Sequence, residues 1–457
     1  MNYSEACEYL NGLQFFKIKL GLESMAELLG RLGHPERALK FLHVAGTNGK
    51  GSVASALTSV LGAAGLKVGL YTSPHLGSVR ERFRVGEEFI PPEEFAREAS
   101  QIRSVLHKTP ITYFEFTTAL ALLWFASRRV DLAVLEVGLG GRLDATNVIT
   151  PLVSIITNVG MDHEQYLGHS LGEIAAEKGG IIKPAVPLVT GRLRPEAQGV
   201  IAAICALHGA PRHQLGQDFF AEAEPGREGD AGGALWRYQG LRSAENGQRQ
   251  VWNALPLALA GAHQRDNCAV ALAALELLRD RCWPLSEEQA RRGLAALRWP
   301  GRLEQFWCDH EGTVLTAAPE PAWAAGFRRY LLDGAHNPDG VESLCHHLRE
   351  TASSRARLIL VWASMVDKAL ALTLPPVASL ADRILLTRPQ SERAAVPSIL
   401  MALLAPPERA RASTLNTVAE ALQAAVVEAG PEDLICVAGS LYLVGEAREI
   451  LRGALAP

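Results

Sequence analysis

A glycine-rich stretch near the start of the chain, residues 43–52 (HVAGTNGKGS), most constrains how this chain can fold. The apolar run 41–45 predicts a short buried strand, and the apolar residues after Gly49 recur at helical spacing. A strand, a glycine-rich loop and a helix in that order present backbone N–H groups and a helix N-terminus to phosphate. Lys50 would place a positive charge on the phosphates, and a Ser or Thr hydroxyl can reach their Mg²⁺.

This stretch departs in two places from the usual phosphate-loop pattern, G-x-x-x-x-G-K-[ST]. Val44 occupies the position of the first glycine, and Gly51 lies between Lys50 and Ser52. A glycine-rich strand-to-helix turn without any ligand is the alternative interpretation of the local sequence. Phosphate binding is the interpretation that we favour.

Length and composition indicate a folded chain of two or three domains. Of the 457 residues, 48% are hydrophobic and 21% are charged, so the chain can bury large cores. The net charge is −4, so the chain has no excess of basic residues. We therefore expect neither a nucleic acid nor a membrane surface as a partner. The seven cysteines are scattered singly, as in reduced core thiols. They are Cys7, Cys205, Cys268, Cys282, Cys308, Cys345 and Cys436.

The sequence shows no targeting or membrane segment. The N-terminal residues lack a basic region followed by an apolar core, and the chain contains no uninterrupted apolar run of membrane-spanning length. These features predict a soluble cytoplasmic protein.

Alternating strand and helix patterns predict a doubly wound α/β domain in the first part of the chain. Further strands are expected at residues 67–71, 131–137, 152–157 and 186–189, after initial helices within 1–40. Helices are expected at 93–107, 115–129, from the capping pair Ser170 and Glu173 to Lys178, at 263–280 and after Ser286. Residues 224–233, rich in glycine and charge, are expected to form a surface loop, followed by short strands within 236–252.

The stretch 299–302 (WPGR) interrupts the pattern, so we place a domain boundary there, between residues 1–298 and 299–457. Beyond it the alternation resumes and predicts a second, smaller α/β domain. Its strands are expected at 330–333, 358–362, 383–387 and 434–437, and its helices at 339–350, 418–429 and 441–451.

Four polar residues fall at the C-terminal ends of the expected strands, where α/β sheets bind their ligands. They are Lys50, Ser73, Glu136 and His163. Glu136 could hold Mg²⁺, directly or through water, or could cap the next loop. His163 alone is more often structural, and imidazole is a soft ligand for Mg²⁺. The joint placement of the four residues is the argument for a metal and phosphate site.

Lys178, Arg302 and the stretch 333–338 (DGAHNP) each allow two interpretations. Lys178 could be a solvated lysine at a helix end, or a lysine that reacts with CO₂ near a metal to form a carbamate. Arg302 could be a surface linker residue, or could reach a triphosphate when the domains close. Residues 333–338 could be a simple turn, or a strand-end loop that faces a ligand.

Taken in order, these stretches resemble the folylpolyglutamate synthase/dihydrofolate synthase family within the Mur-ligase superfamily. The resemblance covers nearly the whole chain and includes the modified phosphate loop, which is the form that this family uses. It rests on seven ordered motifs, at residues 45–52, 72–76 (TSPHL), 136–147 (EVGLGGRLDATN), 160–163 (GMDH), 178–183 (KGGIIK), 299–302 and 333–338.

The resemblance implies an architecture and an activity. The expected fold is α/β, with an N-terminal Mur-ligase-type P-loop ATPase domain that has a parallel-rich sheet and binds ATP and folate. A smaller C-terminal Rossmann-like α/β domain would bind glutamate and close over the nucleotide. The family joins L-glutamate to a pterin-containing carboxylate at the expense of ATP, so the implied ligands are ATP, two Mg²⁺ ions, dihydropteroate or a reduced folate, and glutamate. We expect a monomer.

The resemblance also implies residue roles. The ATP site would comprise Thr47, Asn48, Gly49, Lys50, Gly51, Ser52, Asn267, Arg302 and Asp333. The metal ligands would be Ser73, Glu136, His163 and Lys178, the last as a carbamate. The pterin region would comprise Thr112, Tyr113, Phe114 and Leu143, with Arg82 near a substrate carboxylate. His336 and Ser440 would lie near the incoming glutamate. The residues implied to act in catalysis are Lys50, His163, Lys178 and His336.

The implied chemistry agrees with the residue types. A carboxylate is a poor electrophile, so ATP first converts it to an acyl phosphate, which the glutamate amine then attacks. Both steps build negative charge that preorganised cations such as Lys50 and Arg302 would stabilise. Two other functions stay open, a Mur-type ligase of cell-wall precursors and a P-loop NTPase switch. The 72–76 and 138–144 motifs favour the folate branch, with 7,8-dihydropteroate and tetrahydrofolate both open as acceptors.

Overall fold

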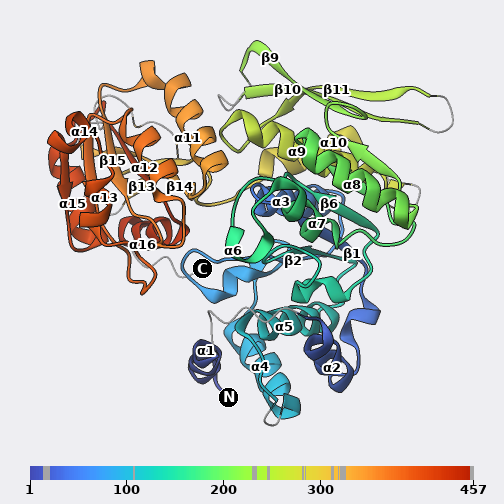
Figure 1. The fold of residues 1–457 in the computed structure, drawn as a ribbon. Coiled ribbons are helices and arrows are strands. Elements are labelled where there is room, and N and C mark those ends of the chain that lie inside the picture. Colours follow the sequence, from blue (N-terminus) through green and yellow to red (C-terminus); the bar gives the residue numbers. More distant parts are fainter. Residues whose placement is uncertain are drawn as a thin grey trace.

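The computed structural model describes residues 1–13, 21–106, 109–228, 234–243, 247–279, 283, 285–309, 313–316, 319 and 326–452. These residues form two α/β parts, each built around its own sheet, and a small third sheet (Figure 1). The α/β prediction is confirmed. Cys282 lies outside the described residues.

The sheet of the N-terminal part has eight strands and is mostly parallel. Its six parallel strands are β2, β5, β1, β6, β7 and β8, and the antiparallel pair β3–β4 extends one edge. In sheet order the strands are β4 (Glu88–Phe89), β3 (Phe83–Val85), β2 (Val68–Tyr71), β5 (Leu132–Glu136), β1 (Phe41–Ala45), β6 (Val153–Ile156), β7 (Leu188–Thr190) and β8 (Arg212–Gln214).

Helices cover both faces of this sheet, which explains the unbroken apolar runs of its central strands. In β5, Leu132 and Val134 belong to one core cluster, whereas Ala133 and Leu135 belong to another. The first cluster includes α3 (Lys50–Ala63), α9 (Ala262–Glu276) and α10 (Glu287–Ala296). The second includes α1 (Tyr3–Gly12), α2 (Glu23–Arg31), α4 (Pro92–Leu106) and α5 (Tyr113–Ser127).

A further core cluster joins the ends of the central strands to α7 (Leu171–Gly179) and α8 (Pro195–His208), and the short α6 (Glu164–Leu167) precedes them. The predicted capping box of α7 is confirmed, because Ser170 and Glu173 exchange side-chain and backbone hydrogen bonds. The 3₁₀ helices are η1 (Pro35–Ala38), η2 (Val79–Arg82), η3 (Ala145–Val148) and η6 (Ala352–Ser354).

A separate three-stranded antiparallel sheet packs on α9 and α10, at the upper right of Figure 1. Its strands are β9 (Phe220–Glu228), β10 (Ala234–Arg242) and β11 (Arg249–Pro256). The prediction of a surface loop at residues 224–233 is therefore wrong for 224–228, which belong to β9, and residues 229–233 lie outside the described residues. A strand can contain glycine and charged residues here because β9 is an edge strand, which pairs only with β10 in the described sheet.

The C-terminal part is a second sheet with helices on both faces. Its parallel strands are β14, β18, β15, β16 and β17, and β12 and β13 extend it in antiparallel fashion. In sheet order the strands are β13 (Val314–Leu315), β12 (Glu304–Cys308), β14 (Arg328–Asp333), β18 (Leu434–Ala438), β15 (Leu358–Trp362), β16 (Arg383–Leu386) and β17 (Ala412–Thr414).

The sequence predicted four of these strands and missed the short edge strands β13 and β17 and the five-residue β12 beside β13. One face is covered by α11 (Pro338–Glu350), α12 (Leu370–Ala378) and α13 (Pro397–Ala402), and the other by α15 (Val418–Glu428) and α16 (Leu441–Arg452). The short α14 (Pro406–Ala410) precedes β17. The boundary at residue 299 stays a prediction and lies between α10 and β12.

Within the described residues, no helix is long and apolar enough to cross a membrane.

Candidate active site

The glycine-rich loop joins β1 to α3 and is held by side chains from the end of β6. The backbone N–H groups of Thr47 and Asn48 both donate to Asn158 Oδ1, at 3.1 and 2.8 Å. Thr157 Oγ1 donates to the carbonyl oxygen of Asn48 at 2.5 Å. The loop is thus fixed before any ligand binds, as preorganised phosphate binding requires.

Close neighbours explain two of the loop glycines. Gly49 has a φ of +79°, and a Cβ there would lie 2.5 Å from Asn267 Oδ1, which α9 brings to the loop. At Gly51, the residue that departs from the usual pattern, a Cβ would lie 2.5 Å from the ring of Trp299. The extra glycine therefore makes room for the segment that joins the two domains.

Two lysines converge on one carbonyl oxygen of this loop. Lys50 Nζ donates to the carbonyl oxygens of Gly46 and Thr47, both at 3.1 Å, and Lys178 Nζ donates to that of Gly46 at 2.9 Å. Lys178 is buried, with 3% of its surface exposed, so the solvated interpretation of this lysine is wrong. Burial, together with the nearby charge of Lys50, lowers the pKa of Lys178 to about 7.

Glu136 ends β5 and faces the same cavity as Lys50. Its carboxylate accepts the backbone N–H of Ser73 at 3.1 Å, and 4% of the residue is exposed. Burial raises the pKa of Glu136, and the Lys50 charge acts in the opposite direction. The structure thus brings Lys50, Ser73 and Glu136 to one cavity of about 180 Å³. The glycine-rich loop, Lys178, His163, Asn267, Arg302 and Asp333 also line this cavity.

Arg302 and Asp333 approach this cavity from the C-terminal side. Asp333 accepts the backbone N–H groups of Leu303 and Ala335 at 2.8 and 2.9 Å, which folds the interdomain segment against the end of β14. Burial lowers the pKa of Arg302, opposed by the charges of Asp333 and Glu136. Because Arg302 lines this cavity, the alternative that it is a surface linker residue is wrong.

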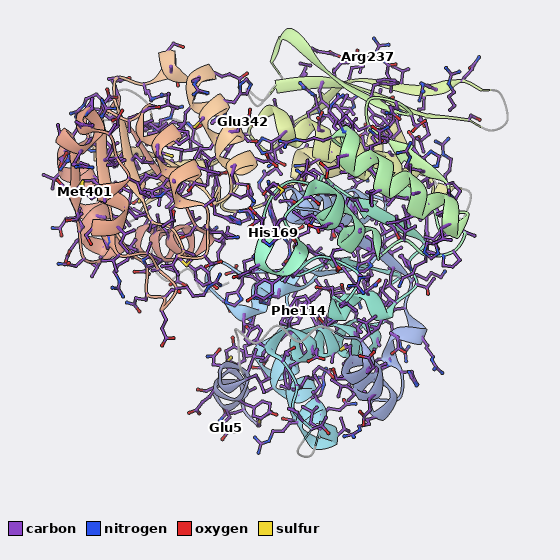
Figure 2. All side chains as sticks on the ribbon, viewed as in Figure 1. Glu5, Phe114, His169, Arg237, Glu342 and Met401 are labelled. Atoms are coloured by element: carbon purple, nitrogen blue, oxygen red, sulfur yellow. The ribbon has the colours of Figure 1, made fainter. Side chains whose placement is uncertain are left out.

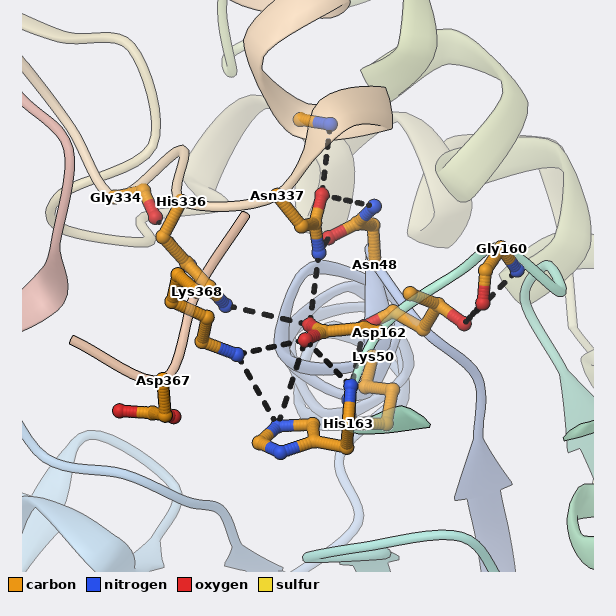
Figure 3. Close-up of polar contacts among 12 residues, drawn as sticks. Asn48, Lys50, Gly160, Asp162, His163, Gly334, His336, Asn337, Asp367 and Lys368 are labelled. Carbon is orange, nitrogen blue, oxygen red and sulfur yellow. Dashed lines mark hydrogen bonds and ion pairs between the residues drawn. The ribbon is translucent and has the colours of Figure 1, made fainter. Parts of the chain in front are cut away.

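Asp162, which the sequence analysis did not single out, is the centre of a polar cluster between the domains (Figure 3). Its Oδ1 accepts from Lys368 Nζ at 2.7 Å, and its Oδ2 accepts from Asn337 Nδ2 at 3.0 Å and lies 3.6 Å from His336 Nε2. Burial alone would raise the pKa of Asp162, but contact with His336 and nearby positive charge lower it well below its usual range.

The neighbours of the two histidines beside Asp162 set the hydrogen-bonding role of one nitrogen in each ring. His336 Nδ1 faces the carbonyl oxygen of Gly334 at 2.7 Å, so Nδ1 carries the proton. His163 Nε2 lies 3.4 Å from Lys368 Nζ, a donor, so Nε2 acts as an acceptor. Burial lowers the pKa of His163 to about 4, which keeps this ring neutral near pH 7.

Lys368, which was not predicted as a site residue, is distinguished in the sequence by its residue type. It is the only lysine among residues 299–457, a segment otherwise rich in arginine. A lone lysine in an arginine-rich domain marks a position where a compact ammonium suits better than a guanidinium. Asp162 and Asn337 lie inside recognised motifs, but nothing in their local sequence indicates that they meet across the domain interface.

A second cavity, of about 330 Å³, adjoins the first and is lined by the residues expected to contact a pterin, Thr112, Tyr113, Phe114 and Leu143. Arg82, expected near a substrate carboxylate, and Ser440, expected near glutamate, also line it. Thr112 caps α5 by accepting the N–H of Glu115 at 3.1 Å, and Phe114 (labelled in Figure 2) lies in the first turn of this helix. Ser440 Oγ accepts the N–H of Leu443 at 3.1 Å, in the first turn of α16.

Arg82 lies 3% exposed in the wall of this second cavity. Its guanidinium lies 5.3 Å from the ring centre of Tyr113, and its Nε donates to His75 Nδ1 at 2.9 Å. Burial and the Arg82 charge lower the pKa of His75 to about 3, so this imidazole stays neutral and can accept.

A third cavity, of about 800 Å³, was not predicted. It lies between α1, the 72–79 loop and α16. Gly51, Glu136 and Arg302 line both this cavity and the phosphate-loop cavity.

Two family descriptions match this chain. The Mur ligase middle domain matches residues 44–190, and the description "Mur ligase, glutamate ligase domain" matches residues 322–441. Folylpolyglutamate synthase of Lacticaseibacillus casei is 34% identical over 462 residues, covering 99% of each chain. Dihydrofolate synthase/folylpolyglutamate synthase of Bacillus subtilis is 33% identical and covers 98% of this chain and 99% of its own.

Solved structures agree with these relatives. Escherichia coli FolC in complex with DHPP and ADP has a TM-score of 0.83 at 31% identity, covering 100% of this chain and 99% of its own. Mycobacterium tuberculosis folylpolyglutamate synthase complexed with ADP has a TM-score of 0.84 at 29% identity and covers 98% of each chain. The chain therefore belongs to the folylpolyglutamate synthase/dihydrofolate synthase family of Mur ligases.

Proposed function

We propose that this chain is an ATP-dependent ligase that adds L-glutamate to 7,8-dihydropteroate, to tetrahydrofolate or to both through an acyl phosphate. The observation that carries this proposal is the junction of the two cavities. The phosphate-loop cavity and the aromatic cavity share Ser73, Pro74, Gly138, Leu139, His163, His336 and Leu441 as lining residues. An acceptor seated on the aromatic side would thus present its carboxylate to the phosphate side.

The phosphate-side residues supply charge stabilisation. Lys50 and the fixed N–H groups of the loop would bind the ATP phosphates, and Arg302 would approach them from the interdomain segment. Transfer of the γ-phosphoryl group to the acceptor carboxylate breaks the bond to ADP and forms the acyl phosphate. The amine of glutamate then attacks the acyl carbon, loses a proton and releases inorganic phosphate.

The donor set fits Mg²⁺ only if phosphate completes it. Among the described residues, no group of three or more His, Cys, Asp or Glu side chains is arranged to hold a metal. Glu136 and His163, with the Ser73 hydroxyl, would leave several positions to phosphate oxygens and water, as Mg²⁺ prefers. Bound Mg²⁺ would neutralise phosphate charge. We expect Glu136→Gln to raise the Mg²⁺ concentration required for half-maximal activity, and an unchanged requirement would contradict this assignment.

Lys178 is suited to carbamate formation. Reaction with CO₂ requires a neutral amine, and a pKa of about 7, against about 10.4 for a free lysine, makes that form abundant at neutral pH. The carbamate would be an anion beside Lys50 and could orient the metal's ligands.

On the glutamate side, we propose that His336 and Ser440 lie near the incoming amino acid. Both residues belong to the C-terminal domain and line the aromatic cavity. Closure of the two domains would bring glutamate to the acyl phosphate and exclude water from it.

A product assay tests the function. The full-length protein would be incubated with ATP, Mg²⁺ and glutamate, and with dihydropteroate or tetrahydrofolate in separate reactions. Glutamylated product with either acceptor supports the proposal and identifies the acceptor. ADP release that is the same with and without acceptors, and without any glutamylated product, would instead favour an NTPase switch. Light scattering of the purified protein would test the expected monomer.

A further inference from the structure

The contacts between the two domains on the glutamate side of the site converge on Asp162 and Asn337. Asp162 lies in the N-terminal domain, directly before His163, and 10% of its side chain is exposed. Its partners Asn337 and Lys368 both come from the C-terminal domain, and 8% of the Lys368 side chain is exposed. A carboxylate and an ammonium so shielded from water are stable only while they remain paired.

Asn337 connects the same cluster to the phosphate loop. Its Nδ2 donates to Asn48 Oδ1 at 3.0 Å, and its Oδ1 accepts from Asn48 Nδ2 at 3.1 Å. Asn48 is one of the two loop residues whose backbone N–H donates to Asn158. The two amides therefore pair across the domain interface, 289 residues apart in the sequence.

The orientation of the Asn337 amide is fixed by its full set of partners. Its two N–H groups serve Asp162 and Asn48, and its oxygen accepts from Asn48 and from the backbone N–H of Gly340, at 2.9 Å. An amide has two donors and two acceptor positions, and here all four are used. A flipped amide would point its N–H groups at another N–H, so the geometry admits one arrangement.

We propose that Asp162 and Asn337 are positioning residues, which latch the C-terminal domain to the phosphate loop and so place His336 and Lys368 at the reaction centre. This proposal rests on the proposed ligase function. The latch joins in one hydrogen-bonded chain the loop that would bind ATP and the loop that carries His336. Breaking it loosens the placement of glutamate relative to the acyl phosphate and leaves the nucleotide contacts of the N-terminal domain in place.

The decisive variant is Asn337→Asp. The introduced carboxylate can still accept the Gly340 N–H, so the cap of α11 is kept. It cannot donate to Asp162 or Asn48, and it places a second negative charge about 3 Å from Asp162. We expect kcat for ligation to fall by about tenfold or more, while the affinity for ADP and the midpoint of thermal unfolding change little.

Two further variants separate positioning from folding. Asn337→Ser keeps a good helix cap and removes the amide without adding charge, so we expect a smaller loss of kcat. The double variant Asp162→Asn/Asn337→Asp exchanges carboxylate and amide, and we expect it to regain part of the activity that Asn337→Asp loses. The matched control is Asp339→Asn, in the first turn of the same helix α11. It removes the charge from the partly exposed interdomain pair of Asp339 with Arg194 and should leave kcat unchanged.

Small-angle scattering in the presence of ADP gives a readout that does not need turnover. A larger radius of gyration for Asn337→Asp than for wild type supports the latch even if no acceptor is ligated, an outcome that would sink only the proposed function. An unchanged kcat and radius of gyration in Asn337→Asp would overturn the latch. An equal loss of thermal stability in Asn337→Asp and Asn337→Ser, without rescue in the double variant, would also overturn the latch. Asp162 and Asn337 would then act only in folding.

Discussion

The loops after β1 and after β14 are built alike but supported differently. Each follows a buried parallel strand and leads into a helix, α3 or α11. The backbone of the first loop is held by its own domain, through Thr157 and Asn158, whereas the Asn48 side chain reaches the opposite domain. The second caps its own helix, but Asn337 and its neighbour His336 find their other partners in the opposite domain.

This difference separates two tasks in the proposed reaction. Phosphate binding depends on a loop whose backbone is held within one domain, so these N–H groups are preorganised before the domains meet. Placement of the amino acid depends on contacts between the domains, and these contacts exist only when the domains meet. Substitutions in the first loop should therefore reduce phosphoryl transfer directly, whereas those in the second should affect glutamate.

The largest effect is expected at Lys50. Lys50→Ala removes the cation that faces Glu136 in the phosphate cavity, and turnover at saturating ATP should fall by about a thousandfold. The measurement is kcat for ADP formation in the presence of acceptor. Lys67→Ala, at an exposed lysine of the same domain, is the matched control. Near-normal turnover in Lys50→Ala would remove the loop from the mechanism.

A somewhat smaller effect is expected at Lys178. Lys178→Ala should lose about a hundredfold in activity, and acetate should restore part of it by replacing the anionic carbamate. Acetate should not rescue Lys50→Ala, because there a cation is missing. The intact mass of the wild type in bicarbonate provides a direct check. Full activity in Lys178→Ala, with an unmodified lysine in the wild type, would limit this residue to its contact with Gly46.

A third effect tests the C-terminal loop. His336→Ala should raise KM for glutamate by about tenfold and leave KM for ATP within about twofold, because His336 belongs to the loop that the opposite domain completes. His346→Ala, at an exposed histidine of α11, is the matched control. If KM for ATP rose as much as KM for glutamate, the division of tasks between the two loops would be wrong.

The smallest effect is expected outside both loops, at Glu276 in α9. Burial raises the pKa of its carboxyl group from 4.5 to about 7, against the opposing N–H of Leu241, which donates to it at 2.8 Å. Because the folded state holds this proton more tightly, its contribution to stability is present below pH 4.5 and is lost as pH rises through 7. With allowance for partial exposure, the change should be about 1–2 kcal/mol.

Thermal unfolding between pH 5 and 8 measures this contribution. The wild type should lose stability with rising pH relative to Glu276→Gln, while Glu222→Gln, at an exposed carboxylate of β9, should follow the wild type. Parallel curves for wild type and Glu276→Gln would contradict the assignment. Activity is expected to be unaffected at neutral pH, since Glu276 belongs to neither loop.

The sequence by itself determined the longer parallel strands and the strand-end loops that line the site. Hydrophobic runs located β1, β5, β15 and β18 within one or two residues, because strands buried on both faces leave a period-free apolar signature. Glycine and a following lysine marked the phosphate loop, because close backbone approach excludes other residues there. Short edge strands such as β4 and β17 were missed, because two or three residues are too few to show a hydrophobic period.

Only the tertiary structure decided which residues meet. Lys178 could be solvated or buried on sequence grounds, and burial against Gly46 settled this and lowered its pKa. The contacts of Asp162 with Asn337 and Lys368 span more than 170 residues of sequence. Local patterns report the periodicity and turns of one segment, whereas charge pairing, desolvation and amide pairing depend on distances that only the packed domains fix.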